Sequence, residues 1–233
     1  MQFTLPFYSF LVFKANLNRI CEMIEDEVAS IHEAHIYLKK FYSKKRRCNF
    51  SREVIDALFL QKSQYYHSPT IMELAYSPKI ACQISVNLHT ARSLYEYSFG
   101  KRDPSLEILG VRFSTDDKSE DAIRELAYYR GTELIRMVRV MKDPKWDICL
   151  LGEQQPFEEG KCYEKIKGKR IKDYFTLEDL IRFATNWGAP IGQDDFWASD
   201  QKMYCWGYLE NDTLKSDADL ADWEEWPQDL PFD

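Results

Sequence analysis

The sequence predicts an α+β protein with a helical N-terminal half and an antiparallel sheet in its second half. Two patterns support this fold class: apolar residues repeat at helical spacing from Leu17 to Tyr42, and short β-type segments follow after Leu106. The composition agrees with a globular chain, because 45% of the 233 residues are hydrophobic and 30% are charged. This balance is too apolar for a disordered chain and too interrupted by charge for a membrane span.

Residues 16–43 are expected to form one long amphipathic helix, with Asn16 as its N-cap. Acidic residues cluster near its start and lysines near its end, which suits the helix dipole. The apolar positions at three- and four-residue spacing are Leu17, Ile20, Cys21, Ile24, Val28, Ile31, His35, Leu38 and Tyr42. Further helices are expected after Ser51 and from about His89 to Tyr97, and a strand is expected over Phe3–Phe13.

In the second half, strands are expected over residues 106–113, 134–141, 146–151 and 203–209. Thr176 is expected to cap a helix that ends just before Gly188. Residues 119–130 leave two interpretations open, because Ser119 followed by two acids is typical of a helix start whereas Arg130-Gly131 is typical of a hairpin turn. We favour a helix there.

We expect one domain over residues 1–233. Its parts are a mainly helical segment to residue 105, the sheet with a helix at 177–187 over residues 106–210, and an acidic tail over residues 211–233. The six cysteines form no C-x-x-C motif, and the apolar start lacks the features of a signal peptide. Reduced thiols in a cytoplasmic protein are therefore expected.

Several kinds of chemistry are excluded by spacing. The glycines are too far apart for a G-x-G-x-x-G loop, and no G-x-S-x-G elbow is present. His32 and His35 share a helix side, but His35 lies on the apolar stripe, which favours a hydrogen-bonded core histidine over a metal ligand. No metal and no cofactor is expected.

One alternative is a Mg²⁺-dependent nuclease that uses Asp147, Glu159 and Lys161. An aspartate followed by Glu-x-Lys is the skeleton of one large nuclease superfamily, in which the carboxylates hold the metal and the lysine orients water. The Glu-x-Lys should lie on a strand, whereas residues 156–160 are typical of a loop. We therefore expect this set to be a coincidence.

Negative charge is concentrated at the end of the chain. Residues 193–233 hold twelve acidic residues and two lysines, whereas the whole chain has a formal charge of −7. The preceding residues are therefore slightly basic. An acidic segment repels phosphate backbones and attracts basic proteins.

The order of motifs from Trp146 onward carries a resemblance to a known group. A strand is followed by Gly152-Glu153-Gln154-Gln155-Pro156-Phe157-Glu158, then by Tyr163, the basic segment 168–175, the capped helix and the Asp194–Trp197 cluster. Over about residues 140–197 this resembles uncharacterised bacterial immunity-type proteins of polymorphic or contact-dependent toxin systems. The resemblance implies a protein that binds and neutralises a toxin.

We therefore expect a non-catalytic inhibitor whose partner is a basic protein, such as a nuclease toxin domain, and neither nucleic acid nor a membrane. A regulatory or scaffold-binding module is the second interpretation, and the nuclease-like enzyme is the third. Tryptophans supply interface anchors and carboxylates supply steering. The residues expected to bind the partner are Asp194, Asp195, Asp217, Asp219, Asp222, Trp223, Glu224, Glu225 and Trp226.

Overall fold

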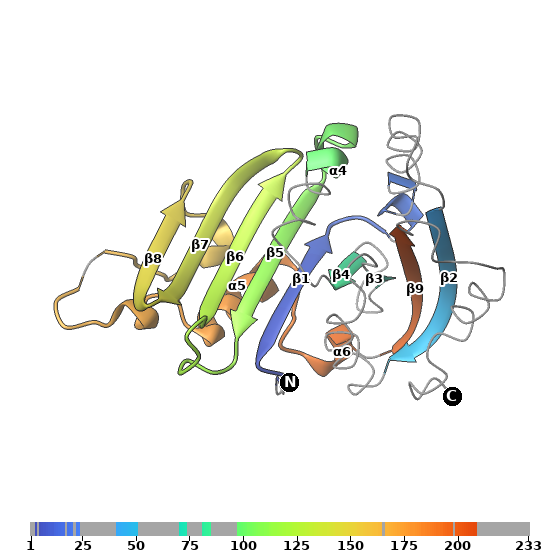
Figure 1. Cartoon of the computed structure of the whole chain (residues 1–233). Coiled ribbons are helices and arrows are strands. Elements are labelled where there is room, and N and C mark those ends of the chain that lie inside the picture. The colour runs from blue at the N-terminus through green and yellow to red at the C-terminus, as the bar shows by residue number, and fades with distance from the viewer. Residues whose placement is uncertain are drawn as a thin grey trace.

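The computed structural model describes residues 3, 5–16, 18–20, 22–23, 41–50, 70–73, 81–84, 97–164, 166–197 and 199–208. In this part of the chain, nine strands form one antiparallel sheet in the order β2-β9-β3-β4-β1-β5-β6-β7-β8 (Figure 1). Strands from the beginning and the end of the chain thus lie side by side, because β2 pairs with β9 along its whole length.

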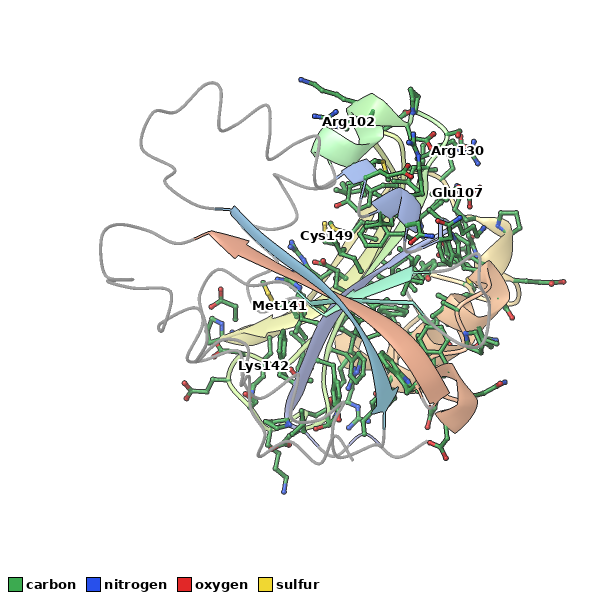
Figure 2. The ribbon with its side chains drawn as sticks, turned by 90° about the vertical axis from the view of Figure 1, so that its right-hand side faces the viewer. Arg102, Glu107, Arg130, Met141, Lys142 and Cys149 are labelled. Carbon is green, nitrogen blue, oxygen red and sulfur yellow. The ribbon has the colours of Figure 1, made fainter. Side chains whose placement is uncertain are left out.

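The strands are β1 (Phe7–Phe13), β2 (Phe41–Phe50), β3 (Thr70–Glu73), β4 (Ala81–Ile84), β5 (Glu107–Ser114), β6 (Ile123–Arg130), β7 (Glu133–Asp143), β8 (Lys145–Leu151) and β9 (Ser199–Tyr208). The α-helices are α4 (Tyr97–Arg102), α5 (Leu177–Trp187) and α6 (Asp194–Trp197), and the 3₁₀ helices are η3 (Pro156–Glu158) and η4 (Ile171–Asp173). Figure 2 looks at the sheet from the side of β2 and β9, which run at a steep angle to β1 behind them. The sheet is therefore strongly twisted, as extended L-peptides favour.

The main core lies between one face of the sheet and the layer of α5, α6, η3 and η4. Alternate residues of β1, β5, β6 and β7 point to this face, which we call the helix face. They pack against aromatic residues of the covering layer, among them Phe183 of α5 and Phe175 just before it. The hydrophobic burial of this layer attaches η3, α5 and α6 to the sheet.

The capped helix predicted after Thr176 is confirmed. The Thr176 side chain accepts a hydrogen bond from the backbone N–H of Asp179, and the Asp179 side chain accepts one from the backbone N–H of Thr176. Gly188 ends the helix with φ of 115°, a left-handed conformation that favours glycine. The strands expected near residues 3–13, 106–113, 134–141, 146–151 and 203–209 are also present, as β1, β5, β7, β8 and β9.

The prediction of a helical N-terminal half is wrong. Residues 18–20 and 22–23 are helical, and Asn16 Oδ1 accepts a hydrogen bond from Arg19 N at 2.8 Å, but residues 41–43 already belong to strand β2. The reason is non-local: Phe41 pairs with Tyr208 and Phe50 with Ser199, and local periodicity does not record pairing over such a separation. Strands β3 and β4 lie in the same half.

The helix favoured over residues 119–130 is also wrong, because residues 123–130 form strand β6. This strand lies between β5 and β7, and residues 123–128 are all buried. A strand covered on both faces loses the alternation of polar and apolar residues by which strands are recognised. The turn predicted at Arg130-Gly131 is the one that joins β6 to β7.

Other expectations fall on residues outside the described ones. They are the apolar stripe of the first helix beyond residue 23, the helix after Ser51, and the segment 89–96 before α4. Within the described residues, none of the helices is both long enough and apolar enough to span a bilayer.

Candidate functional site

A buried ion pair holds the loop that carries the Gly152–Glu158 motif. Arg136 on β7 donates from Nε and Nη2 to the two carboxylate oxygens of Glu158, at 2.8 and 2.9 Å. The same carboxylate accepts a hydrogen bond from the Tyr163 hydroxyl at 2.8 Å and one from the backbone N–H of Gln155 at 3.0 Å. Glu158 is fully buried, so these four bonds replace the water that a carboxylate requires.

The surroundings of the Tyr163 hydroxyl keep it protonated. Burial raises the pKa of Tyr163 well above its usual range, and the adjacent Glu158 carboxylate raises it further. The Tyr163 hydroxyl thus remains a donor to the carboxylate. The Arg136 guanidinium also lies 5.4 Å from the centre of the Tyr163 ring, which adds a cation–π contact. We call Arg136, Glu158 and Tyr163 the buried lock.

The first residue of the motif is fixed by a close backbone approach. Gly152 has φ of 73°, and its carbonyl oxygen accepts a hydrogen bond from Arg136 Nη1 at 2.7 Å. A Cβ atom at this position would lie 1.9 Å from the carbonyl oxygen of Ile135. At the other end, Asn186 Nδ2 of helix α5 donates to the carbonyl oxygen of Phe157 at 3.0 Å. The motif therefore joins the sheet to α5.

The residues proposed for nuclease chemistry are not brought together. Asp147 pairs across the strands with Met141, on the face of the sheet opposite the helix face, and it is exposed. Lys161 is on the helix side, where it forms an ion pair with Asp179 at the start of α5. Glu159 is exposed in the loop after η3. The sheet separates the first carboxylate from the lysine, so the set does not form one metal site in this structure.

The partner of Lys161 has a defined electrostatic environment. Burial alone would raise the pKa of the Asp179 carboxyl, but the bonds from Lys161 and from Thr176 outweigh burial and lower the pKa. The carboxylate is thus ionised at neutral pH, where it caps α5 and holds the lysine. This arrangement stabilises the helix start and leaves the lysine amine engaged with Asp179.

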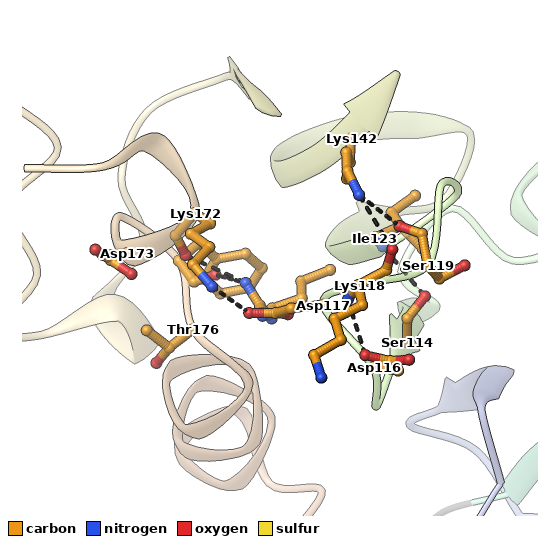
Figure 3. A network of polar contacts seen from close by, with 12 residues as sticks. Ser114, Asp116, Asp117, Lys118, Ser119, Ile123, Lys142, Lys172, Asp173 and Thr176 are labelled. Atoms are coloured by element: carbon orange, nitrogen blue, oxygen red, sulfur yellow. Dashed lines mark hydrogen bonds and ion pairs between the residues drawn. The ribbon is translucent and has the colours of Figure 1, made fainter. Parts of the chain in front are cut away.

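A second cluster of polar contacts holds the basic segment against the sheet (Figure 3). Asp117, in the turn between β5 and β6, forms ion pairs with Arg124 and, at 2.9 Å, with Lys172. Arg124 Nη1 also donates to the carbonyl oxygens of Lys172 and Phe175, at 3.2 and 3.4 Å. The Arg124 guanidinium lies 5.5 Å from the centre of the Trp146 ring at the start of β8. One arginine therefore links β6, β8 and η4.

The segment 166–173, which we call the basic loop, is held in one shape. The Tyr174 hydroxyl accepts a hydrogen bond from the backbone N–H of Ile166 at 2.6 Å, and Lys169 Nζ lies 4.4 Å from the centre of the Tyr174 ring. Arg170 and Asp173 form an exposed ion pair at 2.8 Å, whose hydrogen bond lowers the pKa of Asp173.

The basic loop directs cations and two apolar side chains to the surface. Lys167, Arg170, Ile166 and Ile171 are exposed, and with Lys169 and Lys172 the loop contains four basic residues and a single acid. Ile166 is 51% exposed and Ile171 is 37% exposed. In the sequence, this segment stands out only as part of the resemblance to immunity-type proteins.

The opposite face of the sheet has its own buried charges. Arg112 Nη2 donates to Glu125 Oε2 at 2.8 Å, and Arg139 Nη1 lies 3.8 Å from the same oxygen. Arg112 and Glu125 are buried on neighbouring strands β5 and β6. Two guanidinium groups around one carboxylate stabilise its ionised form, which is the condition for burying such a charge.

Of the predicted partner-binding residues, only the first two lie in the described part. Asp194 is exposed at the start of α6, and Asp195 follows it in the helix. Trp197 is part of the core: its indole Nε1 donates to the carbonyl oxygen of Ile191 at 2.7 Å, and its ring lies 5.1 Å from that of Phe10. The other residues, from Asp217 to Trp226, lie outside the described residues.

All four histidines, including His32 and His35, also lie outside the described part. Within that part, no group of three or more His, Cys, Asp or Glu side chains is placed to hold a metal ion. Cys149 and Cys162 are free thiols, the first half-buried and the second exposed.

Neither the buried lock nor the contacts of Arg124 were predicted from the sequence. Their signal is an arginine at a core-facing position of a strand. Arg136 shares a face of its strand with Val138 and Val140, and Arg124 shares one with Leu126. A charge at such a position requires a buried acid or several carbonyl oxygens nearby. That rule predicts a partner for each arginine but does not identify it.

No family model, curated protein or solved structure matches this chain. The resemblance of residues 140–197 to immunity-type proteins thus stays a prediction. The geometry adds that much of its motif, from Gly152 to Glu158, holds the fold together.

Proposed function

We propose that this protein is a non-catalytic inhibitor that binds a basic protein partner, as the immunity-type resemblance implies. The observation that supports the proposal most is the fixed position from which the acidic segment starts. Asp194 is exposed, while Phe196 and Trp197 in the same short helix are buried in the core. The acidic segment, residues 193–233, thus begins at a short helix whose last two residues are anchored in the core.

This anchoring matters for affinity, because side chains that are held in place before binding lose less conformational entropy than mobile ones. In this proposal, Asp194 and Asp195 provide charge next to the anchored residues. Trp223 and Trp226 act as apolar anchors, and the surrounding carboxylates steer the basic partner and set the specificity. The carboxylates are Asp217, Asp219, Asp222, Glu224 and Glu225.

The test measures binding to the protein encoded by the neighbouring gene, because immunity-type proteins are encoded beside their toxins. The test variant replaces Asp217, Asp219, Asp222, Glu224 and Glu225 by the corresponding amides. We expect a slower association rate and a weaker salt dependence of that rate, at unchanged melting temperature.

A matched variant controls for the loss of five negative charges. It replaces five acids that are exposed elsewhere on the protein: Glu120, Asp121, Glu133, Glu153 and Glu159. We expect it to keep most of the parent's association rate, because these acids are far from the acidic segment in sequence and lie in other loops or, for Glu133, at the start of β7. Equal rates for the two variants would contradict a role for the acidic segment.

The partner's own activity separates the proposal from its alternatives. An inhibitor abolishes that activity at equimolar ratio, whereas a scaffold or regulatory module binds and leaves it unchanged. Mg²⁺-dependent cleavage of nucleic acid by this protein, lost in Glu159→Gln, would instead support the nuclease interpretation.

A further inference from the structure

We propose that the outer edge of β8 and the adjacent basic loop form a second binding site, which takes an extended polypeptide segment with an acidic end and an apolar end. This site lies at the opposite end of the sheet order from β2 and β9, and it does not depend on the function proposed above. The segment would add a tenth strand next to β8.

The first argument is that β8 is an open edge. In the described part of the chain it is the last strand of the sheet, and its ladder is formed with β7 alone (Figure 1). Among the described residues, no backbone hydrogen bond joins residues 145–151 to any other segment. The outward N–H and C=O groups of this seven-residue strand are thus a template for another strand.

The second argument comes from a comparison of the two edges. Strand β2, at the other edge, contains the run Lys44-Lys45-Arg46-Arg47, and charged residues are a common protection against unwanted strand pairing. In β8 the charged residues are confined to the start, at Lys145 and Asp147, and the last four residues are uncharged. The second half of β8 therefore lacks this protection.

The third argument is the exposure of apolar side chains on both sides of that half. Leu150 is 37% exposed and Leu151 is 45% exposed. Successive residues of a strand point to opposite faces, so Leu150 lies on the helix face with Ile148, and Leu151 lies on the other face. A strand paired with β8 would cover both leucines through its own cross-strand neighbours.

The fourth argument concerns charge. The 3₁₀ helix η4 of the basic loop packs against β8, and Arg124 connects Lys172 of this loop to Trp146 at the start of the strand. The cations thus flank the start of β8, while the exposed leucines are at its end. The complementary ligand is acidic at one end and apolar at the other. Antiparallel pairing of two β8 edges from two copies of this chain would place the leucines of each copy beside the basic loop of the other, so a second copy lacks the acidic end that the basic loop would complement.

The loop is also organised for binding before any ligand arrives. Tyr174 fixes Ile166, Asp117 holds Lys172, and Arg124 holds the backbone at Phe175. Of the basic residues in the loop, Lys167 and Arg170 are exposed to solvent. The loop is therefore already ordered before a ligand binds. Binding then costs less conformational entropy, which increases the affinity.

The probe is a synthetic peptide of roughly ten residues, the length of a long strand. Its N-terminal half alternates valine with threonine, and its C-terminal half alternates glutamate with threonine. Antiparallel pairing places the glutamates beside the basic loop, in keeping with the rest of the sheet. A second peptide of the same composition has the two halves exchanged, and a third replaces glutamate by lysine.

Binding is measured by fluorescence anisotropy, and the paired strand is located by hydrogen exchange. We expect the first peptide to bind at least tenfold more tightly than the other two and to slow exchange of the amides of residues 145–151. Equal binding of the first two peptides, no binding at millimolar concentration, or protection elsewhere would overturn the proposal. So would a single-stranded oligonucleotide that binds as tightly as the first peptide, or a dimer of the protein whose own edge is protected.

Two variants test the two ends of the site. Leu151→Lys places a charge on the open edge, and the double variant Lys167→Glu/Lys169→Glu reverses charge in the basic loop. Each should weaken the first peptide at least fivefold. Phe7→Lys is the control for the leucine, since Phe7 is also an exposed apolar residue. Arg19→Glu/Lys101→Glu is the control for the charges. Both controls should leave the affinity within twofold of the parent, and equal losses in test and control would overturn the proposal.

Discussion

Two ion pairs that involve the segment 152–173 show how burial changes the role of an arginine–carboxylate pair. Arg136 and Glu158 have side chains that are 4% and 0% exposed, whereas Arg170 and Asp173 have side chains that are 72% and 36% exposed. The buried pair is bidentate and receives two further hydrogen bonds on its carboxylate. The exposed pair joins residues three apart on the loop surface. The buried pair attaches the Gly152–Glu158 loop to β7, and the exposed pair shapes the surface of the basic loop.

This difference divides the motif that carries the family resemblance. Its first part, Gly152–Glu158, is used to attach a loop to β7 and α5, and its second part, the basic loop, presents cations to solvent. A binding surface requires both parts, because the basic loop keeps its shape only if the residues that support it are held in place. The predictions below compare the two parts by measuring stability and local order.

The largest effect is expected for Arg136→Leu. Removing the guanidinium leaves the Glu158 carboxylate buried without its charge partner, which costs about 3–5 kcal/mol in other buried pairs. The free energy of unfolding, measured by urea titration, should fall by that amount. Arg170→Leu is the matched control and should leave the unfolding midpoint unchanged. Equal effects of the two substitutions would show that the buried lock is not required for the stability of the fold.

Glycine substitutions should show a similar but smaller contrast. Gly152→Ala forces a Cβ atom to within 1.9 Å of the Ile135 carbonyl oxygen in a left-handed conformation, so the backbone has to move. We expect a loss of about 2–3 kcal/mol in unfolding free energy. Gly168 in the basic loop also has positive φ, 84°, but no atom lies within 4 Å of the added Cβ. Gly168→Ala should therefore cost only about 1 kcal/mol.

The same contrast explains what the sequence could predict. Strands β5, β7 and β8 and helix α5 were recognised because their signals are local: alternation, the turn at Pro144, the cap at Thr176 and the terminal Gly188. Strand β6 was missed because it is buried on both faces, which erases alternation. The end of the predicted long helix was wrong because β2 owes its conformation to pairing with β9, some 160 positions later.

The candidate site was harder to predict for a related reason. Asp147, Glu159 and Lys161 have a suggestive spacing, but spacing does not reveal that a sheet lies between Asp147 and Lys161. Arg136 and Glu158 were not selected, although a core-facing arginine signals a buried acid. The surface role of the basic loop depends on Tyr174 and Asp117, whose contacts with it form only in the folded chain.

An intermediate effect, dependent on pH, is expected at the start of α5. The pKa of Asp179 is lower in the folded state than in the unfolded chain, so its contribution to stability is present above the unfolded pKa of about 4 and is lost as pH falls through the folded pKa. Asp179→Asn should therefore cost about 1 kcal/mol at pH 7, through the weakened cap and the loss of the Lys161 pair. As the pH falls from about 4 through the folded pKa, the difference from the parent should shrink toward zero. A difference that stays constant from pH 7 to pH 3 would contradict the ionised cap. Unfolding midpoints in urea at several pH values measure it.

The smallest global effect is expected for Tyr174→Phe, and it separates the two parts of the segment most directly. Tyr163 and Tyr174 each use a hydroxyl to hold a loop, but the first bonds a buried carboxylate whereas the second bonds the backbone N–H of the exposed residue Ile166. A neutral bond at a part-buried site contributes about 1 kcal/mol or less, while a bond to a charged group contributes about 1.5–3 kcal/mol. Tyr163→Phe should thus reduce the unfolding free energy by more than Tyr174→Phe does. Hydrogen exchange should show the reverse local pattern for the basic loop: Tyr174→Phe accelerates exchange of the amides of residues 166–169, and Tyr163→Phe leaves them near the parent rate. If Tyr174→Phe changes neither exchange nor peptide binding at β8, the basic loop keeps its shape without that hydroxyl, and the preorganisation we assign to it must come from the Asp117 and Arg124 contacts alone.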